Sequence, residues 1–121
     1  EMRELLDLGL EIGINGCSLK TAENLAVAAL VPLEALHLET DAPWCTVKRT
    51  HAGHGYTRPL AWPEAKKAAK WEDGHVVKDR CEPCHLVHVL QVVAAVRGED
   101  EAVVAAAATQ NSVRRFFSAR G

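Results

Sequence analysis

Two short β-prone segments decide the fold: Leu10-Glu11-Ile12-Gly13-Ile14-Asn15-Gly16 and Ala35-Leu36-His37-Leu38-Glu39-Thr40-Asp41. The first is rich in β-branched residues and ends in a turn-forming Asn-Gly pair. Between them, apolar residues recur with the helical period, which predicts a helix from about Lys20 to Val31. The order strand, helix, strand predicts two parallel strands joined by a right-handed crossover.

The rest of the chain predicts helices and one long loop. Residues 42–60 hold several Pro and Gly residues, which favours a loop. Helices are expected over Trp62–Trp71, Pro83–Arg97 and Asp100–Ala108, and Asn111 is expected to cap a last turn. We therefore expect one partial domain with a strand-helix-strand part (1–41), the loop (42–60) and a helical C-terminal region (61–121). A parallel sheet needs further strands, which are expected in missing sequence or in a partner chain.

Composition indicates a folded globular domain. The chain has 121 residues, of which 48% are hydrophobic and 25% charged. A formal net charge of -2 argues against a nucleic-acid binder that works by general electrostatic attraction. No apolar run reaches the roughly 20 residues of a membrane span, and the acidic N-terminus does not resemble a signal peptide. The four cysteines suggest no secreted disulfide framework, so we expect reduced thiols and an intracellular protein, cytoplasmic or nuclear, with an organelle as the alternative.

The second β-prone segment carries the strongest candidate site. Alternation along a strand places His37, Glu39 and Asp41 on one face, with both carboxylates near the C-terminal end of the strand. Active sites of parallel α/β folds are built at that end, and a carboxylate there can bind a divalent metal or accept a proton. The alternative is that these acids only cap or salt-bridge a loop.

Four motifs in their order and spacing carry a family resemblance: Asn15-Gly16-Cys17-Ser18-Leu19-Lys20, Leu38-Glu39-Thr40-Asp41-Ala42-Pro43-Trp44, Thr50-His51-Ala52-Gly53 and Lys78-Asp79-Arg80-Cys81-Glu82-Pro83-Cys84-His85. The chain resembles the C-terminal part of the TatD-family metal-dependent deoxyribonucleases, especially the eukaryotic branch. The resemblance implies an α/β fold, namely the last two strands and the C-terminal helices of an amidohydrolase-like (βα)8 TIM barrel, incomplete as given. It also implies hydrolysis of phosphodiester bonds in DNA by metal-activated water.

The resemblance assigns roles to individual residues. It makes Asp41 the metal-site aspartate and a possible proton acceptor, with Glu39 in a supporting catalytic role. Arg80 can hold a phosphate or lock Glu82, and a purely structural ion pair is the alternative. His51 and His54 in the long loop can contact substrate, although exposed loop histidines commonly have no such role.

The departures from the family pattern are as informative as the matches. The other metal ligands of the family, among them a His-x-His pair, precede the matched region, and this chain has no such pair. A divalent metal ion of the Mg or Zn type is expected in the complete enzyme and none in this part alone, which is therefore expected to be inactive. Its partners are DNA if the enzyme is complete, or else a complementary N-terminal chain or an assembly that covers the open barrel edge. The alternative function is a noncatalytic structural or interaction subunit derived from such a nuclease.

Several further residues have two readings each. Lys66, Lys67 and Lys70 share a predicted helical face and can meet DNA phosphates, although a merely solvated face is the commoner case. Trp44 and Tyr56 can stack on bases, or Trp44 can anchor its loop. Cys81-Glu82-Pro83-Cys84-His85 spells a haem-attachment pattern, with His88 as a further potential zinc ligand, which the family match explains without either group. Cys17 and Cys45 are expected to be small buried residues.

Overall fold

The computed structural model describes residues 1–118. Its regular elements are two strands and four α-helices, joined by short 3₁₀ turns. They are α1 (Met2–Asp7), β1 (Ile12–Ile14), α2 (Ala22–Leu30), β2 (Leu36–Leu38), α3 (Leu86–Arg97) and α4 (Glu101–Ser112), which continues into a π-helical turn, Val113–Phe117. No helix in this described part is both long and apolar enough to cross a membrane.

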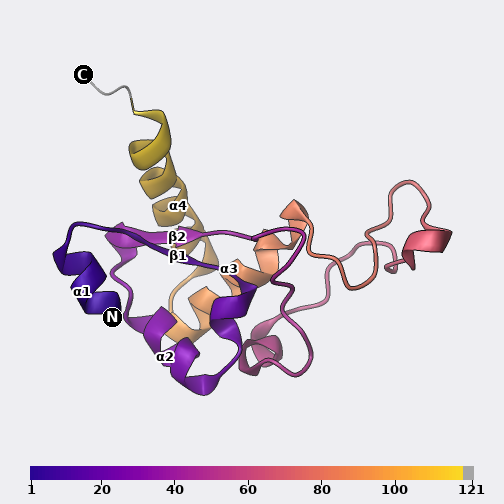
Figure 1. Ribbon diagram of the computed structural model, residues 1–121, viewed down its shortest axis with the longest axis horizontal. Coiled ribbons are helices and arrows are strands. Elements are labelled where there is room, and N and C mark those ends of the chain that lie inside the picture. The colour runs from indigo at the N-terminus through magenta and orange to yellow at the C-terminus, as the bar shows by residue number, and fades with distance from the viewer. Residues whose placement is uncertain (119–121) are drawn as a thin grey trace.

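The strand-helix-strand prediction is confirmed. β1 and β2 pair in parallel, with Ile12 opposite Leu36 and Ile14 opposite Leu38, and α2 forms the crossover (Figure 1). Both strands are shorter than predicted, because the chain turns as soon as the pairing ends. Thr21 starts α2 by accepting a hydrogen bond from the Asn24 backbone N–H at 3.2 Å.

The core lies between one face of the two strands and the helices α2, α3 and α4. Leu36 is fully buried, and it belongs to one apolar cluster with Ile14, Val92, Val93 and Val104. Burial of each such side chain stabilises the fold by about 1.5–3 kcal/mol. The alternation predicted for β2 is confirmed on this face, because Leu36 and Leu38 both point into the core.

The helices predicted for α3 and α4 are confirmed, but α3 begins at Leu86 rather than Pro83 and α4 extends to Ser112 rather than Ala108. α3 stops at Gly98, whose φ of 66° is left-handed, and Asp100 then caps α4 by accepting from the Ala102 N–H at 2.7 Å. The prediction that Asn111 caps a last turn is wrong, because Asn111 lies inside α4 and is only 3% exposed. Its Nδ2 donates instead to the carbonyl oxygens of Leu33 and Leu36, each at 2.9 Å.

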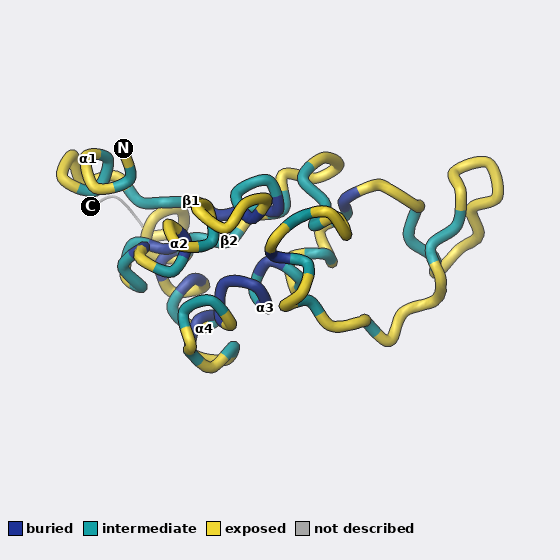
Figure 2. Tube along the Cα trace, turned by 90° about the horizontal axis from the view of Figure 1, so that it is seen from below, coloured by how far each residue is buried: buried dark blue, intermediate teal, exposed yellow. Residues whose placement is uncertain are grey.

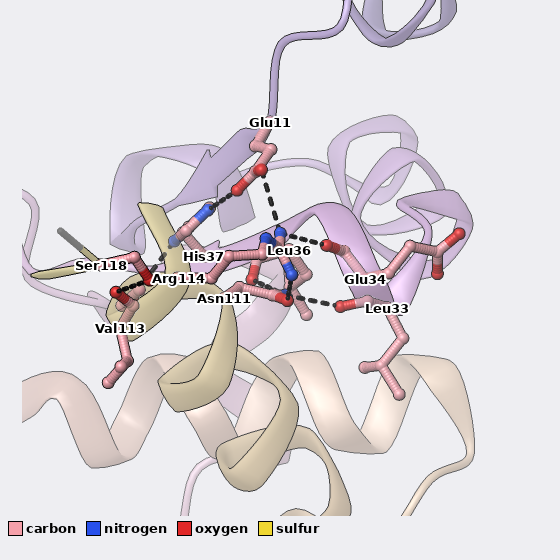
Figure 3. Close-up of polar contacts among 10 residues, drawn as sticks. Glu11, Leu33, Glu34, Leu36, His37, Asn111, Val113, Arg114 and Ser118 are labelled. Atoms are coloured by element: carbon pink, nitrogen blue, oxygen red, sulfur yellow. Dashed lines mark hydrogen bonds and ion pairs between the residues drawn. The ribbon is translucent and has the colours of Figure 1, made fainter. Parts of the chain in front are cut away.

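A polar network surrounds Asn111 at the N-terminal end of β2 (Figure 3). Arg114 donates to Asn111 Oδ1 at 2.9 Å and to Glu11 at 3.0 Å. Glu11 also pairs with His37, whose Nδ1 lies 3.1 Å from the Ser112 hydroxyl. We call these five residues, Glu11, His37, Asn111, Ser112 and Arg114, the Asn111 network.

This network covers part of the outer edge of the sheet. The Glu39 N–H donates to the Ile14 carbonyl, so the backbone groups of His37 and Glu39 face β1. Because these groups alternate in direction along a strand, the N–H and C=O of Leu36 face away from β1. The bond from Asn111 to the Leu36 carbonyl is therefore made at the edge that β1 does not occupy. A side chain from α4 satisfies one edge acceptor that a neighbouring strand would otherwise bind.

The predicted helix over Trp62–Trp71 is wrong. That segment belongs to an irregular arm, residues 58–82, which extends away from the body and is mostly exposed (Figures 1 and 2). Within it only Ala68–Lys70 forms a 3₁₀ turn, and one isolated bridge joins Lys66 to Val77. A helix of this length is marginal in water unless it packs on other elements, and most residues of this segment are exposed. Lys66, Lys67 and Lys70 therefore do not form the helical face expected of them.

Candidate functional site

Asp41 is exposed directly beyond the C-terminal end of β2. The strand ends at Leu38, so the predicted strand alternation does not extend to Asp41. Its φ of 51° is left-handed, a conformation that Asp and Asn tolerate better than most residues, and its carbonyl accepts the Trp44 N–H at 2.9 Å. This tight turn holds the carboxylate at the end of the strand where parallel α/β folds place their active sites.

Glu39 lies over the sheet and is held there by β1. Its Oε1 accepts a hydrogen bond from Asn15 Nδ2 at 3.1 Å. A Cβ added at Gly13 would come within 3.0 Å of Glu39 Oε2, so the carboxylate occupies the space that a side chain at Gly13 would need. Glu39 is thus a positioned carboxylate, with one oxygen engaged in a hydrogen bond.

The loop after Asp41 is tied covalently to the turn after β1. Cys17 and Cys45 form a disulfide with a Cα–Cα distance of 4.9 Å, so the expectation of reduced thiols is wrong for this pair. The two backbones approach so closely that a Cβ at Gly16 would lie 1.9 Å from the Cys45 carbonyl oxygen. Asp41 Oδ2 lies 3.3 Å from Cys45 Sγ, so the disulfide adjoins the candidate carboxylate.

Arg80 and Glu82 form an ion pair rather than an open anion site. Arg80 donates to Glu82 Oε1 at 2.9 Å, and Glu82 Oε2 accepts the Val77 N–H at 3.1 Å. The Arg80 guanidinium is the main reason why the pKa of Glu82 is lowered. The Glu82 N–H donates to His85 Nδ1 at 2.8 Å, closing the 3₁₀ turn that precedes α3.

Cys81, the first residue of the haem-like pattern, is buried and connects two segments. Its N–H donates to the Pro43 carbonyl at 3.0 Å, which joins the Arg80–Glu82 turn to the loop after Asp41. Its thiol donates to the Thr40 carbonyl at 3.6 Å, and burial raises the pKa of that thiol. Cys84 is exposed, so the two cysteines of the pattern have different environments.

His51 borders a hollow beside Asp41, and His54 follows in a 3₁₀ turn, Ala52–Tyr56. His51 Nδ1 accepts the Lys48 N–H at 3.2 Å. Burial, followed by the charges of Lys20 and Lys48, lowers the pKa of His51. The hollow has a volume of about 240 Å³, and we call it the Trp44 pocket; its lining residues are Cys17, Lys20, Pro43, Trp44, Cys45, Thr46, Lys48, His51 and Asp79.

Sequence reasoning did not select Lys20 and Lys48 and directed attention to the lysines of the arm instead. The sequence did contain one indication that Lys20 and Lys48 lie close together, because each follows a cysteine of the disulfide by three positions. This spacing can be interpreted only once Cys17 and Cys45 are known to be paired.

The described residues do not by themselves complete a metal site. Across residues 1–118, no group of three or more His, Cys, Asp or Glu side chains is placed to hold a metal ion. Asp41 offers one carboxylate, and Glu39 is partly engaged by Asn15. A divalent ion at Asp41 would therefore need ligands from outside the described residues.

Known proteins match this chain over most of its length. The family model "TatD related DNase" matches residues 1–118. The "Deoxyribonuclease Tat-D" of Schizosaccharomyces pombe is 44% identical over 80% of this chain and 31% of its own length. The "3'-5' ssDNA/RNA exonuclease TatD" of Citrobacter rodentium is 35% identical over 96% of this chain and 37% of its own length. The chain thus spans about a third of the length of these relatives.

Solved structures match the fold equally well. A TatD-family hydrolase from Entamoeba histolytica superposes with a TM-score of 0.90 at 29% identity, covering 96% of this chain and 38% of that one. An uncharacterized amidohydrolase from Saccharomyces cerevisiae superposes with a TM-score of 0.87 at 38% identity, covering 95% and 36%. The α/β arrangement described here is therefore part of an amidohydrolase-like barrel, and the chain belongs to the TatD-related DNase family.

Proposed function

We propose that this chain is part of a metal-dependent deoxyribonuclease that hydrolyses phosphodiester bonds in DNA, with Asp41 in its active site. The observation that carries the proposal is the placement of Asp41 in a family member: an exposed carboxylate on a left-handed turn directly after a parallel strand. Carboxylates so placed bind metal ions or accept protons in α/β enzymes.

The other candidate residues support Asp41 in this proposal. Glu39, oriented by Asn15, is a neighbouring carboxylate at the same sheet end. Arg80 holds Glu82, and the Cys81 N–H anchors their turn to the loop after Asp41, so we assign Arg80 and Glu82 a positioning role in substrate binding. We place His51 and His54 on the side from which substrate approaches.

We also propose that residues 1–118 have no nuclease activity without the rest of a barrel. The described residues offer Asp41 without a full ligand set, so catalysis needs ligands from the rest of a barrel of about 250 residues. We propose that those ligands come from sequence beyond this chain or from a complementary chain.

One observation is compatible with the alternative as well, a noncatalytic subunit of an assembly. An apolar groove of about 350 Å³ runs between β2, α3 and α4 and is lined by Leu38, Leu86, Val87, Leu90, Val113 and Phe117, among others. Phe117 is 78% exposed there. Apolar surface of this kind is typical of protein contacts, and either the rest of a barrel or an unrelated partner can bury it.

Native mass spectrometry of the protein isolated from its source, with metal content read in the same spectra, separates the two functions. A longer chain, or a complementary fragment, carrying divalent ions supports the nuclease and is followed by a DNA cleavage assay. A 13.2 kDa species without metal and bound to unrelated proteins contradicts the nuclease and supports the structural subunit.

A further inference from the structure

The Trp44 pocket lies next to the proposed active site and has a fixed shape. The Trp44 N–H is bonded to the Asp41 carbonyl, and Cys45, in the same wall, adjoins the Asp41 carboxylate. The disulfide from Cys17 to Cys45 holds the two main walls together. The Ala52 N–H donates to the Lys20 carbonyl at 3.0 Å, which attaches the His51 segment to the wall that carries Lys20.

The lining of the pocket carries more positive than negative charge. Lys20 and Lys48 border it, and within residues 1–118 neither forms an ion pair. Asp79 is the acidic residue of the lining. His51 Nδ1 accepts a backbone N–H, so the proton of the neutral ring is on Nε2, where it can be donated. Two ammonium groups and an imidazole donor suit a phosphate oxygen.

Trp44 adds a stacking surface to these cations. Trp44 is 71% exposed, although its backbone is fixed by the Asp41 turn and by the disulfide of its neighbour Cys45. An exposed indole beside lysines is the combination that binds single-stranded nucleic acids, in which unpaired bases stack on aromatic rings and cations contact the backbone. The alternative interpretation, in which Trp44 anchors its loop, does not account for this exposure.

We propose that the Trp44 pocket binds one nucleotide of a single-stranded nucleic acid, with its phosphate on Lys20 and Lys48 and its base against Trp44. This inference rests on the proposed nuclease function and specifies where the strand next to the cleaved bond is held.

The test uses the protein encoded by the natural gene and a fluorescein-labelled hexathymidylate in EDTA, with anisotropy as the readout. Trp44→Leu weakens binding by about 10-fold, as expected for the loss of one stacked base. The double variant Lys20→Gln/Lys48→Gln lowers the slope of log affinity against log salt by about 0.7 per lost phosphate contact. With Mg²⁺, the same variants raise KM for single-stranded DNA more than they lower kcat.

Two matched controls come from the arm. Trp71→Leu removes an exposed tryptophan and Lys67→Gln an exposed lysine; both belong to the arm that extends away from the body (Figure 1), neither lines the pocket, and neither is expected to change affinity. Circular dichroism and thermal melting of every variant confirm that the exposed substitutions leave the fold intact.

The outcomes distinguish a failure of the pocket proposal from a failure of the proposed nuclease function on which it rests. If the protein cleaves DNA but the pocket variants keep the affinity, salt slope and KM of the natural protein, the pocket proposal is wrong and the nuclease proposal remains valid. A natural protein that neither binds the hexathymidylate nor cleaves DNA overturns both. Losses in the pocket variants but not in the arm variants support the proposal.

Discussion

The two ends of β2 are surrounded by polar residues of very different character. At the N-terminal end, Asn111 is 3% exposed and the network around it pairs its side chains with one another or with backbone carbonyls. At the C-terminal end, Asp41 and Trp44 are exposed on a backbone that is held tightly by its own hydrogen bond and by the neighbouring disulfide. Polar groups that satisfy each other stabilise a fold, whereas polar groups held rigid and left exposed are available to a ligand.

The largest expected effect concerns the disulfide at the exposed end. Cys45→Ser, or reduction with dithiothreitol, is expected to lower the free energy of unfolding by about 3–4 kcal/mol, because the bond closes a loop across a sequence separation of 28 residues. Urea denaturation measures it. Cys84→Ser, which removes an exposed free thiol, is the matched control and leaves stability unchanged. Equal stability of the Cys45→Ser and Cys84→Ser variants would show that the loop does not depend on the bond.

The Asn111 network provides the next effect. Asn111→Ala removes the Nδ2 donor to the carbonyls of Leu33 and Leu36 and one of the acceptors of the Arg114 guanidinium, and it is expected to cost about 2–3 kcal/mol. Gln110→Ala, one position away on the exposed side of α4, changes stability by less than about 0.5 kcal/mol. Thermal denaturation compares the two variants, and a similar loss in both would contradict the structural role of the network.

Gly16→Ala tests the close approach of the two loops at the exposed end. The added Cβ would overlap the Cys45 carbonyl oxygen, so the loop has to move, and we expect a loss of about 1–2 kcal/mol together with reduced DNA cleavage. Gly55→Ala has open space around its Cβ and serves as the control. A fully active Gly16→Ala protein would mean that the loop geometry does not matter for function.

The smallest effect is the pH dependence contributed by Glu11. Hydrogen bonds from His37 and then Arg114 lower the pKa of Glu11. The stabilisation is therefore complete above the ordinary pKa of 4.5 and disappears as the pH falls through the lowered folded value. Glu11→Gln is expected to cost about 1 kcal/mol at pH 7 and nothing once wild-type Glu11 is protonated. Glu34→Gln, at an exposed site, should keep the wild-type pH profile, and parallel profiles for all three proteins would refute the assignment.

Local patterns were sufficient to predict the body of the fold. The strand signals around Ile14 and Leu36, the period of α2, and Gly98 and Asp100 at the ends of α3 and α4 are all short-range features, and each was confirmed. The segment Trp62–Trp71 has helical residues too, but whether a short helix persists depends on what it packs against. The residues of the segment itself do not indicate what it packs against.

The candidate site was predictable in its chemistry and only partly in its assembly. Asp41 and Glu39 stand out because acids follow an apolar strand. The pairing of Cys17 with Cys45, the role of Asn111 and the pocket around Lys20 and Lys48 depend on contacts between distant parts of the chain. Spacing within a single sequence does not encode such contacts in a readable form.

The most direct test of the central claim is DNA cleavage by the natural-length protein carrying Asp41→Asn. Asn preserves the size of the side chain and tolerates the left-handed backbone, so the substitution removes the charge and leaves the turn in place. We predict a fall in kcat of roughly 10²–10⁴-fold with an unchanged melting temperature, while Asp73→Asn in the arm stays fully active. Full activity in Asp41→Asn would contradict the placement of the active site at this end of β2.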